Sequence, residues 1–110
     1  EWASVYASDA LRAASRNAVF VHAAGNQGQA QLTDVEWASA AASNFIVVGS
    51  VGPTGAISHF SNTPGQACLT FNGACNVGGR LMDRFLVAPG EWILVSDGRG
   101  GVERRSGTSY

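Results

Sequence analysis

The chain has 110 residues, of which 45% are hydrophobic and 14% charged, so it can form one globular core and lies outside the disordered class. Its formal net charge is −1 and its basic residues are all arginines, so it has no field to attract nucleic acid or an anionic membrane. No apolar run approaches the ~20 residues that cross a bilayer, so no membrane span is expected.

The first part of the chain predicts a helix followed by a strand. Residues 2–16 carry apolar side chains at steps of four and three, which is typical of an amphipathic helix, and Asn17 is a plausible stop. Residues 19–24 predict a short buried strand. The helical stripe consists of Trp2, Tyr6, Ala10 and Ala13.

A second helix and a second strand are expected next. Thr33 and Glu36 have the spacing of a capping box, which predicts a helix over about residues 34–43. Residues 45–51, "FIVVGSV", form a short β-branched apolar run that suits a strand covered on both faces. The turn "GPTG" follows it, and residues 56–60 predict a returning hairpin partner.

The last part of the chain predicts a loop and then extended structure. Residues 61–84 are broken by Gly, Asn, Pro and Cys, and we expect a loop there. Extended segments follow at residues 85–88 and 92–96, before the glycine-rich turn at residues 97–101. Strands separated by helices indicate an α/β protein with a mostly parallel sheet that ends in an antiparallel segment.

The strand at residues 19–24 runs into Asn26, which stands between Gly25 and Gly28. In a parallel α/β sheet, functional groups collect in loops beyond the carboxyl ends of the strands. There an Asn amide can donate an N–H to an oxygen that gains negative charge during acyl transfer. The alternative is a structural Asn that forms a turn with its own backbone.

The chain ends in "SGTSY", with Gly107 and Ser109. A serine after Gly-Thr suits the first turn of a helix, where backbone N–H groups stabilise a nearby oxyanion, and Gly107 would leave room beside it. Gly, Thr and Ser are also ordinary loop residues, so this motif alone is weak.

Four segments, "AAGNQG", "FIVVGSVGPTGAISHFSNTPG", "LVAPG" and "SGTSY", occur in the order and approximate spacing of one known family. They resemble the carboxyl-terminal half of the catalytic domain of subtilisin-like serine proteases, the subtilases or peptidase S8 family. The resemblance implies a partial three-layer α/β fold with a mostly parallel sheet, incomplete at both ends. Residues 1–110 would then be a fragment of one catalytic domain, from the helix before the oxyanion strand to the nucleophile.

The resemblance also implies roles for particular residues. Ser109 matches the nucleophile and Asn26 matches the oxyanion asparagine. The segments at residues 60–62 and 88–90 match scaffold around the site. The wall and rim of the primary specificity pocket correspond to Ala23, Ala24, Gly25 and Gln27.

The Asp and His of the family's catalytic triad have no counterpart in this chain, because their motifs lie upstream of its first residue. His22 and His59 match neither, and we expect them to be packing or hydrogen-bonded histidines. Without a base, Ser109 has the reactivity of an ordinary alcohol, so the segment alone is expected to be inactive. The partners implied are a polypeptide substrate and the remainder of the catalytic domain.

Cys68 and Cys75 have six residues between them within the expected loop. A local disulfide is favoured over two free thiols, and a zinc site lacks enough ligands. A disulfide-bearing insertion at this place resembles subtilases secreted by Gram-negative bacteria, including autotransporters, and implies a secreted or cell-surface protein. The acidic residues show no spacing for calcium, so we expect neither a metal nor a cofactor here.

Three alternatives remain open at this point. An α/β-hydrolase nucleophile elbow could begin at "GTSY", although that elbow follows a buried apolar strand and "VERRSGTS" is polar. A catalytically dead subtilase-like module could bind peptide or support assembly. A generic α/β domain could hold an anion at "AAGNQG", which lacks the glycine spacing and lysine of nucleotide sites.

Overall fold

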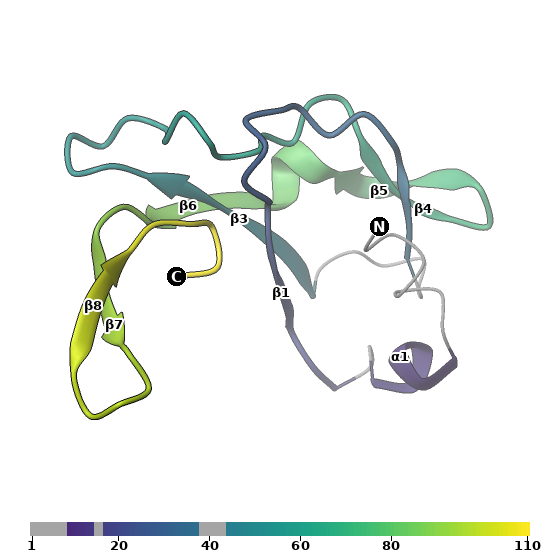
Figure 1. Cartoon of the computed structure of the whole chain (residues 1–110). Coiled ribbons are helices and arrows are strands. Elements are labelled where there is room, and N and C mark those ends of the chain that lie inside the picture. Colours follow the sequence, from purple (N-terminus) through teal and green to yellow (C-terminus); the bar gives the residue numbers. More distant parts are fainter. Residues whose placement is uncertain (1–8, 15–16, 38–43) are drawn as a thin grey trace.

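The computed structural model describes residues 9–14, 17–37 and 44–110 (Figure 1). Its central sheet contains β1 (Phe20–Ala23), β3 (Phe45–Val51) and β6 (Phe85–Pro89) in the order β1-β3-β6. Both pairings are parallel, as the sequence predicted. The carboxyl ends of the three strands therefore lie along one edge of this sheet.

The helix expected near the start of the chain is confirmed where the structure describes it. Helix α1 covers Asp9–Ala14, with Asp9 in its first turn, where a carboxylate complements the positive end of the helix dipole. The Asn17 N–H donates to Ala14 O at 3.1 Å and closes its end. Residues 2–8 and 15–16 of the predicted helix, with Trp2 and Tyr6 among them, lie outside the described residues.

The helix predicted over residues 34–43 is wrong at its start, and residues 38–43 lie outside the described residues. Strand β2 covers Val35–Glu36 and pairs in parallel with the strand that carries Leu69 and Thr70. Val35 and Trp37 are fully buried on one side, so the local period is two. The Glu36 carboxylate accepts hydrogen bonds from the Thr70 hydroxyl on the paired strand and from the Asn72 N–H instead of capping a helix.

The loop predicted over residues 61–84 is also wrong. Strand β4 (Cys68–Phe71) and strand β5 (Ala74–Arg80) form an antiparallel hairpin, and a short 3₁₀ helix follows at Leu81–Arg84. Asn72 and Gly73 turn the hairpin with φ angles of 52° and 80°, as a two-residue Asn-Gly turn requires. This dipeptide between two extended segments was the sequence signal that could have revealed the hairpin.

Cys68 on β4 and Cys75 on β5 form a disulfide, with their Cα atoms 5.7 Å apart. The favoured pairing is thus confirmed. The bond joins the two strands of one hairpin, close to the turn where Glu36 accepts N–H groups from Asn72, at 2.6 Å, and from Gly73. Covalent and polar cross-links therefore both hold this hairpin.

The turn after β3 is confirmed, but its expected partner strand is reduced to one bridge. The Gly55 N–H donates to Gly52 O at 3.0 Å, and Ile57 pairs with Val51 in an isolated antiparallel bridge. A hydrogen bond of 2.9 Å from Ser58 N to Ser50 O continues the contact.

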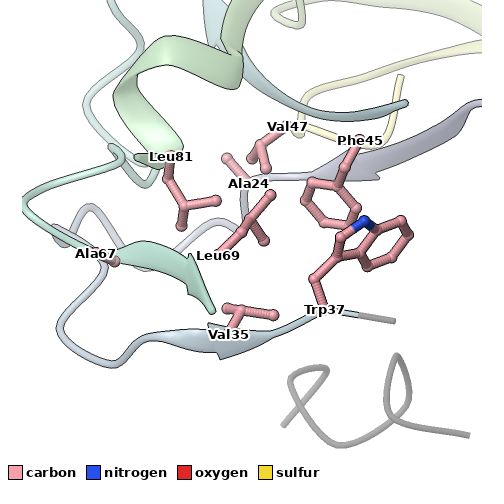
Figure 2. Close-up of a cluster of buried hydrophobic side chains, with 8 residues drawn as sticks. All are labelled: Ala24, Val35, Trp37, Phe45, Val47, Ala67, Leu69 and Leu81. Atoms are coloured by element: carbon pink, nitrogen blue, oxygen red, sulfur yellow. The ribbon is translucent and has the colours of Figure 1, made fainter. Parts of the chain in front are cut away.

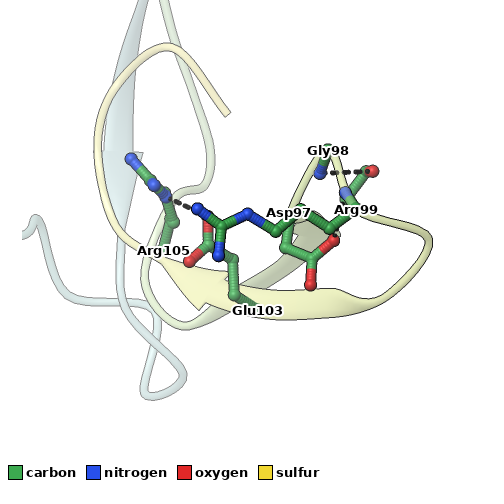
Figure 3. Close-up of polar contacts among 6 residues, drawn as sticks. Asp97, Gly98, Arg99, Glu103 and Arg105 are labelled. Atoms are coloured by element: carbon green, nitrogen blue, oxygen red, sulfur yellow. Dashed lines mark hydrogen bonds and ion pairs between the residues drawn. The ribbon is translucent and has the colours of Figure 1, made fainter.

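The antiparallel segment at the end of the chain is confirmed as β7 (Ile93–Ser96) and β8 (Val102–Arg105). Asp97 closes their turn, and its Oδ1 accepts the Arg99 N–H at 2.7 Å and the Gly101 N–H at 3.0 Å. Figure 3 shows this turn beside Glu103, whose Oε1 accepts a hydrogen bond of 2.7 Å from Arg105 Nε. This ion pair raises the pKa of the Arg105 guanidinium.

The hydrophobic core lies between the central sheet and the sheet formed by β2, β4 and β5 (Figure 2). The Trp37 ring contacts Phe45 edge-on at 4.9 Å and Phe20 edge-on at 5.2 Å. Along β3, Phe45 and Val47 are buried whereas the alternating Ile46 and Val48 are half-buried. The described residues thus cover one face of β3 well, rather than both. The core cluster is Ala24, Val35, Trp37, Phe45, Val47, Ala67, Leu69 and Leu81.

Candidate active site

The loop that carries Asn26 leaves the carboxyl end of β1 through a sharp turn. The Ala24 N–H donates to Val48 O at 2.9 Å and continues the parallel pairing one residue beyond β1. Gly25 follows with φ at 103°, a conformation that L side chains rarely adopt. Gly28 has φ at 65°, and a Cβ there would lie 2.7 Å from His59 O. Both glycines therefore act as expected, one in the turn and one at a close backbone approach.

The "SGTSY" segment reaches the same sheet edge through the "APG" turn. The Gly90 N–H donates to Val51 O, at the end of β3, at 3.1 Å, and the Gly107 N–H donates to Gly90 O at 2.8 Å. A Cβ on Gly90 would lie 2.3 Å from Ser50 Oγ and 2.7 Å from Gly107 O. Close packing at Gly90 thus fixes the position of the Gly107 backbone relative to the end of β3.

Asn26 contacts the end of the chain directly. The Thr108 backbone N–H donates to Asn26 Oδ1 at 2.9 Å, and the Gly25 N–H donates to Thr108 Oγ1 at 3.0 Å. Because a backbone N–H can only donate, the carboxamide oxygen must face Thr108. The Nδ2 group of Asn26 is left as the donor on the other side of the amide, 3.5 Å from where a Cβ on Gly107 would stand.

Ser109 follows Thr108 directly and is exposed, as is Asn26. The residues around Ser109 form a turn, in which the Tyr110 N–H donates to Gly107 O at 3.5 Å. The helix expected to start at this serine stays a prediction. The segment follows the antiparallel strand β8 rather than a buried parallel strand, which argues against an α/β-hydrolase elbow.

The residues expected to line a specificity pocket lie beside this contact. Ala23 and Gly25 are half-buried, Ala24 is buried and Gln27 is exposed, so the loop passes from the sheet interior to the surface. The Gln27 Oε1 atom accepts a hydrogen bond of 2.7 Å from Asn62 Nδ2. Gln27 is therefore held at the surface by a defined partner.

Sequence reasoning assigned Thr108 no role and placed Asn62 in scaffold, yet both contact the Asn26 loop. The side-chain oxygen of Asn62 accepts the Gln27 and Gln29 backbone N–H groups at 3.1 and 3.0 Å. Both residues stood within the quoted motifs, "SGTSY" and "SNTPG". Their partners are far away in the sequence, so no local pattern could have identified the contacts.

Both histidines have the packing contacts expected of them. His22 is half-buried on β1, its ring stacks with Phe45 at 6.5 Å, and burial lowers the pKa of its imidazole. His59 is exposed and contacts Phe60 edge-on at 5.5 Å.

Within residues 9–14, 17–37 and 44–110, no group of three or more His, Cys, Asp or Glu side chains is placed to hold a metal ion. In the same part of the chain, no helix has the length and hydropathy needed to cross a membrane.

The solved structures that resemble this chain include three of proteases. The Prenylagaramide maturation protease PagA is 26% identical, with a TM-score of 0.60 and a match that covers 93% of this chain and 32% of that one. A mutant of the protease domain of PatA is 30% identical, with a TM-score of 0.56 and the same two coverages. The self-cleaved protease domain of PatA is 30% identical, with a TM-score of 0.57, and the match covers 93% of this chain and 34% of that one.

The chain thus spans about a third of the length of these structural relatives. No curated protein is significantly similar to it. The sequence profile described as the Subtilase family matches residues 1–110, the whole of the chain. The parallel sheet, the Asn26 loop beyond β1 and the match along the entire sequence agree, and the chain belongs to the subtilase family.

Proposed function

We propose that this chain is the carboxyl-terminal portion of a subtilase catalytic domain, and that the full-length protein is a serine endopeptidase. The observation that carries the proposal is the hydrogen bond of 2.9 Å between Thr108 N and Asn26 Oδ1. It joins the loop of the oxyanion candidate to the residue that precedes the nucleophile candidate. One carbonyl carbon could then meet the Ser109 hydroxyl while its oxygen meets the Asn26 amide.

The proposed reaction is peptide-bond hydrolysis through an acyl-enzyme. Ser109 Oγ attacks the carbonyl carbon and passes its proton to a histidine supplied by the rest of the domain. Asn26 Nδ2 and the Ser109 backbone N–H bind the oxyanion that forms. The C–N bond then breaks as the histidine returns the proton to the leaving amine, and water hydrolyses the ester by the reverse sequence.

The 110-residue segment alone is proposed to be inactive. Its described histidines are engaged elsewhere, because His22 stacks on Phe45 and His59 contacts Phe60. A serine hydroxyl without an adjacent base is a poor nucleophile at neutral pH. The segment would therefore contribute the nucleophile and the oxyanion donor, and the upstream part of the domain would contribute the base and its Asp partner.

The substrate is proposed to be an extended polypeptide, since the similar solved proteins are named as proteases and one as a maturation protease. Ala23, Ala24 and Gly25 would form one wall of the primary specificity pocket, and Gln27 would stand at its rim. These side chains are small apart from Gln27, which leaves space for a large substrate side chain.

An exported location is proposed from the disulfide between Cys68 and Cys75. Disulfides persist in oxidising compartments and are rare in the cytosol of most organisms. Secretion or cell-surface exposure, and the autotransporter type in particular, stay predictions.

The decisive experiment is covalent labelling of the full-length protein with a serine-directed phosphonate or sulfonyl fluoride. We expect the label on Ser109, found by peptide mapping, and no label or proteolysis in Ser109→Ala. Ser106→Ala is a matched control, because Ser106 lies three residues earlier and its Oγ only accepts the Trp92 N–H at 3.0 Å. Labelling elsewhere, or a Ser109→Ala protein that still cleaves peptides, would contradict the proposal. A full-length protein that is neither labelled nor proteolytic would instead favour a peptide-binding module.

A further inference from the structure

The side chain of Asn62 is saturated with hydrogen bonds to the loop that carries Asn26. Its Oδ1 accepts the backbone N–H groups of Gln27 and Gln29 at 3.1 and 3.0 Å. Its Nδ2 donates to Ala24 O at 3.1 Å and to Gln27 Oε1 at 2.7 Å. A carboxamide has two donor hydrogens and two acceptor positions, so all four are used.

These partners bracket Asn26 on both sides. Ala24 precedes it by two residues, Gln27 follows it directly, and Gln29 lies three residues beyond it. The Asn62 backbone N–H adds a bond of 2.9 Å to Gly25 O.

Neighbouring residues extend the contact on both sides. The Gly28 N–H donates to Phe60 O at 2.7 Å, and the Thr63 N–H donates to Gln29 O at 3.0 Å. The segment around Asn62 therefore runs along the whole Asn26 loop and fixes its course.

Space around the amide is as restricted as its hydrogen bonding. A Cβ on Gly25 would lie 2.5 Å from Asn62 Nδ2 and 2.9 Å from Gln27 Oε1. The half-buried Asn62 is itself anchored, because the Ser61 hydroxyl donates to Asn62 O at 3.0 Å and accepts the Ser50 N–H at 3.0 Å. A chain of contacts thus runs from β3 through Ser61 and Asn62 to the loop.

We infer that Asn62 is a positioning residue that holds the Asn26 amide in register with Thr108 and, through Gln27, fixes the rim of the specificity pocket. This inference rests on the proposed function. Stabilisation of an oxyanion depends on a donor that is placed before the reaction, and a displacement of the loop weakens it without removing the donor. Asn62 touches no reacting atom in this scheme, and it acts through Asn26.

The conservative variant is Asn62→Asp, which keeps the shape and the two accepted N–H bonds but replaces both donor hydrogens with acceptor oxygen. The new carboxylate would face Ala24 O, which can only accept, so the loop must shift. We expect kcat in the full-length protein to fall about tenfold or more, yet less than the 10²–10³ known for loss of an oxyanion donor in a subtilisin. KM should stay near that of the wild type.

A double mutant separates positioning from general destabilisation. If Asn62 acts through Asn26, the Asn26→Ala/Asn62→Asp protein should be nearly as active as Asn26→Ala alone. Losses that multiply would overturn the inference. Asn44→Asp is the matched control, because Asn44 Nδ2 donates to Ala18 O at 3.0 Å at the amino end of β3, away from the site; its kcat should equal that of the wild type.

A second measurement does not depend on catalysis. Asn62→Ser removes all four side-chain bonds, so backbone hydrogen exchange at Gln27 and Gln29 should accelerate, and it should stay unchanged in Asn44→Ser. Two outcomes would overturn the role of Asn62 and leave the proposed function intact. One is unchanged hydrogen exchange in Asn62→Ser, and the other is full kcat in Asn62→Asp when the wild-type protein is labelled at Ser109. A wild-type protein that fails to label at Ser109 would instead overturn the proposed function, and with it the catalytic part of this inference.

Discussion

Asn26 and Thr108 are 82 positions apart, and the Thr108 backbone N–H donates to Asn26 Oδ1 at 2.9 Å. This bond fixes the direction of the carboxamide, because the oxygen must meet the donor. An asparagine at the exposed end of a strand is thereby explained: it links two loops and still presents an N–H group. Aspartate could make the link without the donor, and alanine could do neither.

Two substitutions of Asn26 separate these roles in the full-length protein. Asn26→Asp keeps an acceptor for Thr108 N–H but loses the donor, whereas Asn26→Ala loses both. Both should lower kcat by about 10²–10³, the loss known for removal of such a donor in a subtilisin, with little change in KM. An active Asn26→Asp enzyme would show that the amide only anchors the loop.

Gly90→Ala should displace the "SGTSY" segment, which carries the proposed nucleophile Ser109. The added methyl group would lie 2.3 Å from Ser50 Oγ and 2.7 Å from Gly107 O, both of which are held by packing or hydrogen bonds. We expect kcat to fall at least about tenfold, because small misplacements of reacting groups are costly. Gly98→Ala is the control, since a Cβ there meets nothing within 4 Å although φ is 75°. Equal activity of the two variants would argue against this role of Gly90.

Trp37 should be a main contributor to stability. Its side chain is fully buried between Phe20 and Phe45, so Trp37→Ala should lower the free energy of unfolding by about 3–5 kcal/mol. Trp92, which is 65% exposed, is the matched control and should change stability by less than about 0.5 kcal/mol as Ala. Denaturant titration of both variants measures the difference, and similar midpoints would contradict the placement of the core.

Because His22 is partly buried, we expect the folding stability of the protein to fall in mild acid. Burial lowers the pKa of its imidazole in the folded protein below the ordinary 6.5. As pH falls below 6.5, the unfolded chain binds a proton that the folded protein resists, so folding stability falls until the lowered pKa is passed. Above 6.5 this group contributes no pH dependence.

The measurement is the denaturant midpoint between about pH 8 and pH 5. His22→Phe, which keeps a ring against Phe45, should flatten the profile relative to the wild type. An unchanged slope in the His22 variant would show that other groups cause the acid sensitivity.

The disulfide should stabilise the β4–β5 hairpin moderately. Chain entropy predicts about 2.5 kcal/mol for a loop of this length, so the Cys68→Ala/Cys75→Ala protein should unfold at lower denaturant concentration. A reducing agent should shift the wild type in the same direction and leave the double variant unaffected. If reduction changes neither protein, the hydrogen bonds that the Asn72 and Gly73 N–H groups donate to Glu36 suffice to hold the hairpin.

Local residue patterns predicted several of the strands correctly. The strand at Phe45–Val51 and the extended segments at residues 85–88 and 92–96 were recognised, because a short β-branched apolar run and flanking turn residues act within a few positions. The spacing of Thr33 and Glu36 led to a wrong prediction, because burial of Val35 and Trp37 in the core and the pairing of β2 with β4 outweighed the helix signal. Hydrophobic burial of a tryptophan and a valine is worth more than one cap.

The sequence by itself determined the family, the parallel pairing of the central sheet and the identity of the candidate residues Asn26 and Ser109. Only the tertiary structure decided which way the Asn26 amide faces, and that Thr108 and Asn62 hold its loop. The reason is physical: hydrogen bonds over 35 or 82 residues depend on how strands stack in a sheet, and no local spacing encodes them.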